Sequence, residues 1–175
     1  MQTERQKGFT LIELMVSLII LSVLMAIAVP NFVDWIKNNR IDAATRNLTG
    51  AFQLARSEAV SRQTVITINS GGDWSDGLTI YTDTNPAGNT DYAAAQDSLI
   101  KSLDYSMDGI TATSNDGDNF ISFTSTGLLN EGPLAQRRIT ICDDRDEAEG
   151  TLITLSTLGR ATISSINAPT TCDAP

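Results

Sequence analysis

The sequence predicts an α+β fold in which one long N-terminal helix packs against an antiparallel β-sheet head. From Phe9 to Arg62 the apolar residues first run almost without a break and then recur at three- and four-residue steps, the spacings of a helix. Beyond Arg62 the period changes to two, in short β-branched runs separated by Gly, Asn, Asp and Pro. A helix followed by a series of strands is the pattern of an α+β domain. The 175 residues suffice for one such domain and one extended helix.

The chain opens with a short polar leader, residues 1–8, and continues with an apolar segment, residues 9–30, in which Glu13 is the single charged residue. A helix of about 20 apolar residues crosses a bilayer. Because Arg5 and Lys7 lie in the leader, the positive-inside rule keeps it cytoplasmic and directs the rest of the chain outward. A carboxylate within lipid is costly unless it is paired, so Glu13 indicates a function.

An ordinary secretory signal is the main alternative for this segment. Ala26-Ile27-Ala28 fits an A-x-A cleavage site, and cleavage there releases a secreted binding domain that starts at Val29. However, the apolar segment exceeds the usual signal core of about 7–15 residues. Neither this alternative nor a plain membrane anchor gives Glu13 a role.

The helical pattern continues over residues 31–62 with one apolar face. Pro30 removes a backbone hydrogen bond and crowds the preceding turn, so we expect a kink where the helix leaves the membrane. The apolar stripe of this second part consists of Ile41, Ala44, Leu48, Ala51, Phe52, Ala55 and Ala59. An amphipathic helix of this kind lays its stripe on a globular domain, and its small residues allow a sheet to approach closely.

The head, residues 63–175, is predicted to contain seven short strands. They are Thr64–Ile68, Leu78–Thr82, Leu99–Asp104, Phe120–Thr124, Arg138–Cys142, Thr151–Ser156 and Ala161–Ile166. Turn sequences such as Gly71-Gly72-Asp73 and Asn130-Glu131-Gly132-Pro133 separate them. Neither an internal repeat nor a linker divides the head.

Composition excludes several function classes. The chain has no histidine, which removes Ser-His-Asp and Cys-His nucleophile schemes and most zinc sites. The head carries five basic residues against sixteen acidic ones, and this balance disfavours nucleic-acid binding. We therefore predict no catalytic residue, metal or cofactor. Cys142 and Cys172 are the two cysteines, and in an exported domain they predict one disulfide; two buried free thiols are the alternative.

Three features of the head have both a structural and a functional interpretation. The loop from Asp83 to Asp91 partly matches a calcium loop but lacks the closing Glu, so a solvated turn is favoured. The acidic run over residues 143–149 is a solvated loop or an interface with a basic subunit. Trp74 and Tyr81 cover the edge of a small core or form a ligand-binding pair, and we favour the core.

Gly8-Phe9-Thr10-Leu11-Ile12-Glu13-Leu14 resembles the class III signal of type IV pilins and type II secretion pseudopilins. The resemblance implies that a prepilin peptidase cuts between Gly8 and Phe9 and methylates Phe9, and that the apolar helix is retained. It also implies that Glu13 meets the N-terminal amine of a neighbouring subunit during assembly. Relief of a costly carboxylate by docking favours assembly in register.

Later motifs resemble the GspH/FimT group of minor pilins, which includes FimU. They are Ala55-Arg56-Ser57-Glu58-Ala59-Val60, Trp74-Ser75-Asp76-Gly77-Leu78, Phe123-x-Ser125-x-Gly127 and Gly159-Arg160. The resemblance implies a pilin fold and a minor type IV pilin that primes or caps a pilus. It implies a single-pass inner-membrane protein with its head in the periplasm, later found in the pilus. The implied partners are prepilin peptidase, other major and minor pilins, an inner-membrane assembly platform, and membrane lipid before assembly.

The resemblance also leaves two other functions open. The first is a minor pseudopilin of a type II secretion system, which shares the helix motif. The second is a DNA-binding pilin for natural transformation, which uses a Gly-Arg-x-Arg motif. Here Gly159-Arg160-Ala161-Thr162 lacks the second arginine, so Arg160 is at most a weak DNA contact. Arg137-Arg138 is the other basic pair that DNA would use, but the acidic head disfavours this function.

Overall fold

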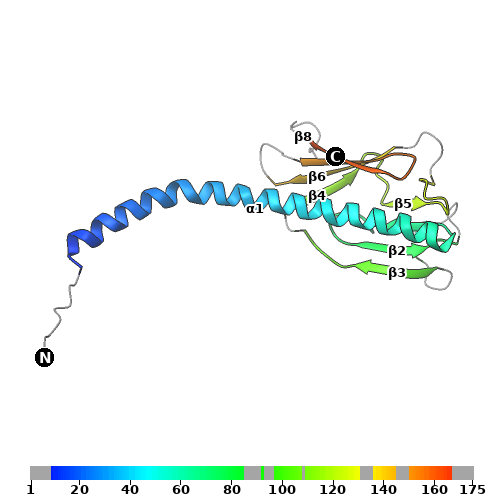
Figure 1. The fold of residues 1–175 in the computed structure, drawn as a ribbon, viewed down its shortest axis with the longest axis horizontal. Helices are drawn as coiled ribbons and strands as arrows, with labels where there is room; N and C mark the ends of the chain where they lie inside the picture. Colours follow the sequence, from blue (N-terminus) through cyan, green and yellow to red (C-terminus); the bar gives the residue numbers. More distant parts are fainter. Residues whose placement is uncertain are drawn as a thin grey trace, which may run out of the picture. The chain divides into compact units, whose positions relative to one another are not determined.

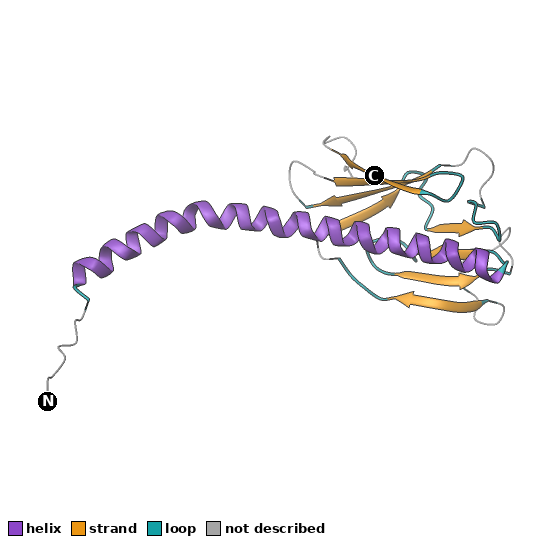
Figure 2. Cartoon of the chain, viewed as in Figure 1, coloured by secondary structure: helices purple, strands orange, loops and turns teal. Residues whose placement is uncertain are grey.

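The structure is a computed structural model that describes residues 9–84, 92, 97–107, 109–130, 136–144 and 150–166. Within these residues it has one helix followed by eight strands (Figures 1 and 2). The elements are α1 (Leu11–Arg62), β1 (Ile66–Asn69), β2 (Leu78–Thr82), β3 (Ser98–Leu103), β4 (Ile110–Ser114), β5 (Phe120–Phe123), β6 (Arg137–Asp143), β7 (Gly150–Leu155) and β8 (Ala161–Ile166). The chain forms two compact units, one up to Asn38 and one from Asn39 onward, so α1 contributes to both.

Local chemistry sets the C-terminal end of α1. Gln63 adopts a left-handed conformation with φ of 54°, and the Thr64 N–H donates to the Ala59 C=O at 3.3 Å. This bond is the one that closes a Schellman motif and satisfies a carbonyl that the helix leaves without a partner. Arg62 lies in the last turn, where a positive charge interacts favourably with the helix dipole.

The strands of the head form two antiparallel four-stranded sheets. The first has the order β3-β2-β1-β5, and the second has the order β4-β6-β7-β8. The registers place apolar residues on one face; in the first sheet Ile68 lies between Ile80 and Ile121. In Figure 1 the head part of α1 runs between β2 and β3 on one side and β4, β6 and β8 on the other.

The hydrophobic core of the head is built by α1 and both sheets. All seven residues of the predicted apolar stripe are buried, and Leu48 and Phe52 are at most 1% exposed. The Phe52 and Trp74 rings meet edge to face, with centroids 5.9 Å apart. Burying one such large side chain stabilises the fold by about 1.5–3 kcal/mol. The core thus holds the second part of α1 against both sheets.

The predicted α+β architecture is confirmed, and each of the seven predicted strands overlaps an observed one. Trp74 and Tyr81 are buried, as the core interpretation predicts. The prediction missed β4, whose sequence Ile-Thr-Ala-Thr-Ser contains a single large apolar residue, Ile110. It also began the first strand too early, because Thr64 belongs to the cap of α1 rather than to β1.

A tight junction connects α1 to the turns of the head. The Arg56 Nε–H donates to the Gly127 C=O at 2.9 Å. Gly159 has a φ of +70°, and a Cβ at this position would lie 2.5 Å from the Gly127 oxygen and 2.9 Å from Arg56 Nε. Glycine is therefore required at 159 by both conformation and space.

We predict that Gly159→Ala lowers the free energy of unfolding well beyond the cost of its conformation. A left-handed alanine costs about 1–2 kcal/mol, and forcing a methyl group into a filled site adds about 1–3 kcal/mol. Gly71→Ala is the matched control, since Gly71 has a φ of +69° but open space around the added Cβ. Chemical denaturation of the full-length chain in detergent measures both; equal losses would contradict the tight junction.

Candidate functional site

The start of α1 is organised by a capping interaction. Thr10 Oγ1 accepts a hydrogen bond from the Glu13 N–H at 3.2 Å, and the Thr10 C=O accepts one from the Leu14 N–H at 3.2 Å. The spacing Thr-x-x-Glu is that of a capping box, so Thr10 fixes the first turn and places Glu13 within it. Phe9 lies just before the cap and is 85% exposed. Gly8, the predicted cleavage residue, lies outside the described residues.

The first part of α1 presents an apolar surface on all sides. From Leu11 to Trp35 every large apolar side chain is between 44% and 76% exposed. The helix is long enough to span a membrane, and its most apolar 18-residue window has a mean hydropathy of 2.7 and no buried residue. Apolar surface of this extent needs lipid or other protein chains around it.

Glu13 stands out among the polar groups of this segment. The Ser17 and Ser22 hydroxyls each donate to a carbonyl of their own helix at 2.8 Å, so they need no external partner. In the part of the chain that the structure describes, the Glu13 carboxylate forms no hydrogen bond or ion pair. A carboxylate in such an apolar surface is costly unless it is paired.

Pro30 lies inside α1, which continues through it. Because proline has no N–H, the helix lacks one backbone bond at this point. At the next residue, the Asn31 side-chain amide donates to the Ile27 C=O at 2.8 Å. Phe32 and Trp35 stack at 5.7 Å on the following turn, where the apolar surface ends. Aromatic residues are common at membrane–water interfaces. The predicted kink stays a prediction.

Cys142 is buried in β6 and is disulfide-bonded. Cys172 lies outside the described residues, so the predicted pairing of the two cysteines stays a prediction. Cys142 pairs in register with Thr111 of β4 and Gly150 of β7. A covalent link at this central strand restrains the second sheet at one of its inner strands.

The two adjacent arginines of β6 have different environments. Arg137 is 5% exposed and forms ion pairs with Asp116 and with Asp118, the latter at 2.8 Å. Its guanidinium also lies 5.8 Å from the centre of the Phe120 ring. Arg137 is therefore engaged inside the head, whereas Arg138 is exposed. From the sequence we considered this basic pair as a DNA contact, but the Arg137 side chain is buried and forms ion pairs inside the head.

Asp83, the first residue of the calcium-like loop, also has a structural role. It is 4% exposed, and its carboxylate accepts a hydrogen bond from the Thr67 hydroxyl at 2.9 Å. The Thr67 and Ser122 hydroxyls are 2.7 Å apart, so Thr67 of β1 connects Asp83 at the end of β2 with Ser122 of β5. Residues 85–91 of the loop and 145–149 of the acidic run lie outside the described residues.

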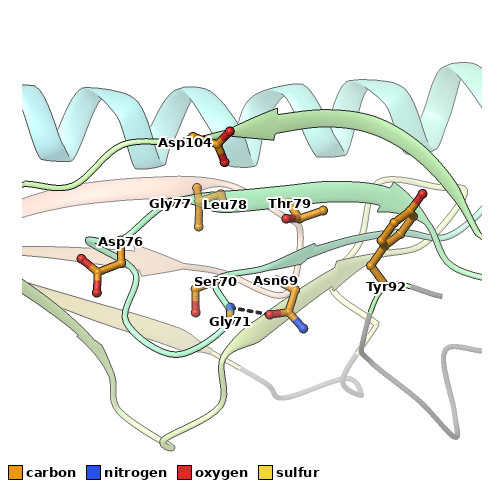
Figure 3. Close-up of a pocket in the computed structure, with 9 residues that line it drawn as sticks. All are labelled: Asn69, Ser70, Gly71, Asp76, Gly77, Leu78, Thr79, Tyr92 and Asp104. Carbon is orange, nitrogen blue, oxygen red and sulfur yellow. Dashed lines mark hydrogen bonds between the residues drawn. The ribbon is translucent and has the colours of Figure 1, made fainter. Parts of the chain in front are cut away.

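A pocket with a volume of about 280 Å³ lies beside β1 and β2, and sequence reasoning missed it; Figure 3 draws the residues that line it. Asp76 and Asp104 line it together with Tyr92. Asn69 Oδ1 accepts a bond from the Gly71 N–H at 2.6 Å, and Asp104 accepts one from Ser102 at 3.0 Å. Among the described residues no group of three or more His, Cys, Asp or Glu side chains could hold a metal ion.

Arg160 borders a larger groove of about 790 Å³ between α1 and the β7–β8 hairpin. Its lining includes Arg56, Ser57 and Val60 from α1 and Gly159, Arg160 and Ala161 from the hairpin. Neither Arg56 nor Arg160 forms an ion pair with any described residue. Sequence reasoning singled out Arg160 but missed Arg56 as its neighbour across the groove.

Two family models match different regions of the chain. Residues 44–159 match the family described as type II transport protein GspH, and residues 4–29 match the prokaryotic N-terminal methylation motif. A stretch of 58 residues is 41% identical to the type IV narrow pilus major component PilA5 of Thermus thermophilus. That match covers 31% of this chain and only 50% of the relative.

The fold is similar to that of the type IV minor pilin FimU of Pseudomonas aeruginosa. One crystal structure gives a TM-score of 0.62 at 24% identity, covering 77% of this chain and 98% of the other. A second crystal form gives 0.57, with 73% of this chain covered. Both resemblances that the sequence indicated, the class III signal and the GspH-type head, are confirmed.

We predict that Asp116 makes the stability of the head depend on acid pH. Partial burial raises the pKa of Asp116, but hydrogen bonds from Ser114 and Arg137 and the charge of Arg137 outweigh it and lower the pKa below its ordinary value. The stabilisation of the head by the Asp116 carboxylate is therefore complete above the pKa of this group in the unfolded chain, about 3.9. It is lost as the pH falls through the lower pKa of the group in the folded chain. The denaturant concentration at the unfolding midpoint of the full-length chain should therefore decrease once the pH is lowered below about 4.

The Asp116→Asn variant tests whether Asp116 causes the loss of stability at acid pH. It should start from a lower midpoint and show a smaller decrease on acidification than the parent chain. Asp76→Asn is the control, because Asp76 is exposed and has no ion pair with a described residue. A decrease of full size in Asp116→Asn would assign the acid sensitivity to other groups.

Proposed function

We propose, on the premise that this chain belongs to the GspH family of type II transport proteins, that it is a minor type IV pilin which primes or caps a pilus. As a member of this family it is a structural subunit and not an enzyme. The observation that carries the proposal is the first part of α1, an exposed apolar surface that contains one carboxylate, Glu13. A helix with this surface is suited to lipid at first and to the apolar centre of a helical filament afterwards.

The chain reaches the filament through processing at the methylation motif. Prepilin peptidase cuts between Gly8 and Phe9 and methylates the new amine of Phe9. The apolar helix then stays in the inner membrane as a single span, with the head in the periplasm. The Thr10 cap preserves the first turn of α1 and keeps Glu13 close to the new terminus.

Glu13 supplies the register of assembly. In lipid its carboxylate is unpaired and costly, and in the filament it pairs with the N-terminal amine of a neighbouring subunit. The ion pair forms only when one helix is offset from the next by the length between the two groups. Apolar packing between helices has little positional preference, whereas a charge pair of this kind selects one offset.

The alternative within the same class is a minor pseudopilin of a type II secretion system. The family description and the methylation motif suit both machines equally. The 58-residue likeness to a narrow-pilus component favours the pilus. The partners in the pilus are other major and minor pilins and the inner-membrane assembly platform.

We predict that the exported protein begins at a methylated Phe9. Its intact mass should equal that of residues 9–175 with one added methyl group, reduced by two hydrogens if the disulfide is present. The apolar segment is retained because it is the assembly surface. A mass that corresponds to a start at Val29 would instead establish an ordinary secretory signal and overturn the proposal.

We predict that Glu13→Gln prevents assembly while leaving the head folded. A strain deleted for this gene should lose surface pili, and a plasmid copy should restore them. The Glu13→Gln copy should restore at least about tenfold fewer, since removing one partner of a buried charge pair costs several kcal/mol. Ser17→Ala, one turn further along, is the control and should restore pili fully, because the Ser17 hydroxyl bonds its own helix.

The same strains distinguish the pilus from the secretion machine. Loss of pili with unchanged protein secretion supports the minor pilin. Normal pili in the deleted strain, with a loss of secretion, would assign the chain to the secretion system instead.

A further inference from the structure

The edge strands of the two sheets differ in how they are protected. Exposed edges pair readily with other chains, and proteins usually guard them. The edge strand β4 is covered by the turn that precedes β2. The Ala112 N–H donates to the Asp73 carboxylate at 3.1 Å, and the Ala112 C=O accepts from the Trp74 N–H at 3.2 Å. The outward backbone groups at the middle of β4 are therefore already bonded.

The two edges of the first sheet are also guarded. At β5 the Ser122 C=O accepts from the Asn130 N–H at 2.9 Å, and Phe123 forms an isolated bridge with Leu129. At β3 the register with β2 shifts between Ile80 and Tyr81, and the strand carries Lys101. Bulges and lysines are two of the devices that prevent strand addition.

β8 has none of these devices. Its sequence Ala-Thr-Ile-Ser-Ser-Ile contains no charge and no proline, and it pairs with β7 in unbroken register over six residue pairs. The Ser156 N–H donates to the Arg160 C=O at 2.9 Å, and bonded pairs alternate along an antiparallel ladder. The backbone groups of Ala161, Ile163 and Ser165 therefore point to the free edge. Among the described residues nothing binds them from that side.

The free edge of β8 adjoins the groove that Arg160 borders. Ile163 is in register with Ile153, so both side chains lie on the core-facing side of the sheet. Ile153 is fully buried, whereas Ile163 is 57% exposed. Across the groove α1 contributes Arg56 and Val60, the latter 49% exposed. The core-facing side of the sheet thus extends past β7 to a largely exposed Ile163, which the described residues leave uncovered.

We propose that an extended segment of a neighbouring pilin-class subunit adds to β8 as a fifth strand of this sheet. Its backbone bonds the outward groups of Ala161, Ile163 and Ser165, and alternate side chains enter the groove. The segment carries a carboxylate that faces Arg56 and Arg160, and an apolar side chain that covers Ile163. Charge complementarity supports this occupant, because both guanidinium groups lack an ion pair among the described residues. The inference rests on the proposed function, since it needs neighbouring subunits.

Three variants of the full-length chain test the proposal in cells that carry the complete set of pilins. Ile163→Lys places a charge where the added strand would pack. Ser165→Pro removes an outward N–H and leaves the bonds to β7 intact, because Ser165 is at a position that does not bond β7. Ser164→Lys is the control, since it adds the same charge on the opposite face of the same strand.

The readout is the amount of the chain in sheared filaments relative to the membrane fraction. Ile163→Lys and Ser165→Pro should each lower this ratio about tenfold, the first because it removes an apolar contact of the added strand and the second because it removes an interface hydrogen bond. Ser164→Lys should leave it unchanged. Equal ratios for all variants, with the parent chain present in filaments, would overturn strand addition and leave the minor-pilin function intact. Absence of the parent chain from filaments would overturn both.

A photo-crosslink identifies the occupant. Ile163→p-benzoylphenylalanine should crosslink to an extended segment of another subunit that bears the N-terminal methylation motif, and the same group at Ser164 should not. Crosslinks to DNA or to lipid at position 163, without a subunit product, would assign the groove to a different ligand and overturn the proposal.

Discussion

The apolar surface of the first part of α1 is the constraint on which the rest of the molecule depends. From Leu11 to Trp35 no large apolar side chain is less than 44% exposed, an arrangement that is stable only away from water. The same helix continues into the head, where a stripe from Ile41 to Ala59 is buried. One backbone thus passes from a non-aqueous environment into a protein core. The sequence encodes the change as two patterns, apolar on all sides and then apolar on one face.

The head follows from the need to cover that stripe. Two four-stranded sheets and the second part of α1 share one core, and Arg56 joins α1 to the turns of both sheets through Gly127 and Gly159. Buried polar groups have partners within the head: Arg137 forms ion pairs with two aspartates, and Asp83 accepts a hydrogen bond from Thr67. Three sheet edges are guarded, while no described residue bonds the outer edge of β8. We regard the open edge as the part of the head that its neighbours use.

The spacing of apolar residues in the sequence predicted the helix and most of the strands. The stripe of α1 and seven strands were found because each has a local pattern that burial selects. β4 was missed since its alternation involves Thr and Ala with one isoleucine. Pairing between distant side chains leaves no local signal. Arg137 meets Asp116 and Asp118 about twenty residues away in sequence, so it read as surface charge. The sequence also carried no sign that Arg56 and Arg160, about a hundred residues apart, line one groove.

Amide hydrogen exchange along α1 tests the central claim most directly. The full-length chain in lipid bilayers should show two slowly exchanging stretches, residues 14–29 covered by lipid and residues 44–59 covered by the head. Residues 36–40 between them should exchange faster, because their side chains are mostly exposed and lie beyond both covers. Exchange in residues 14–29 as fast as in 36–40 would show that lipid does not cover the first part of the helix, and would contradict the account.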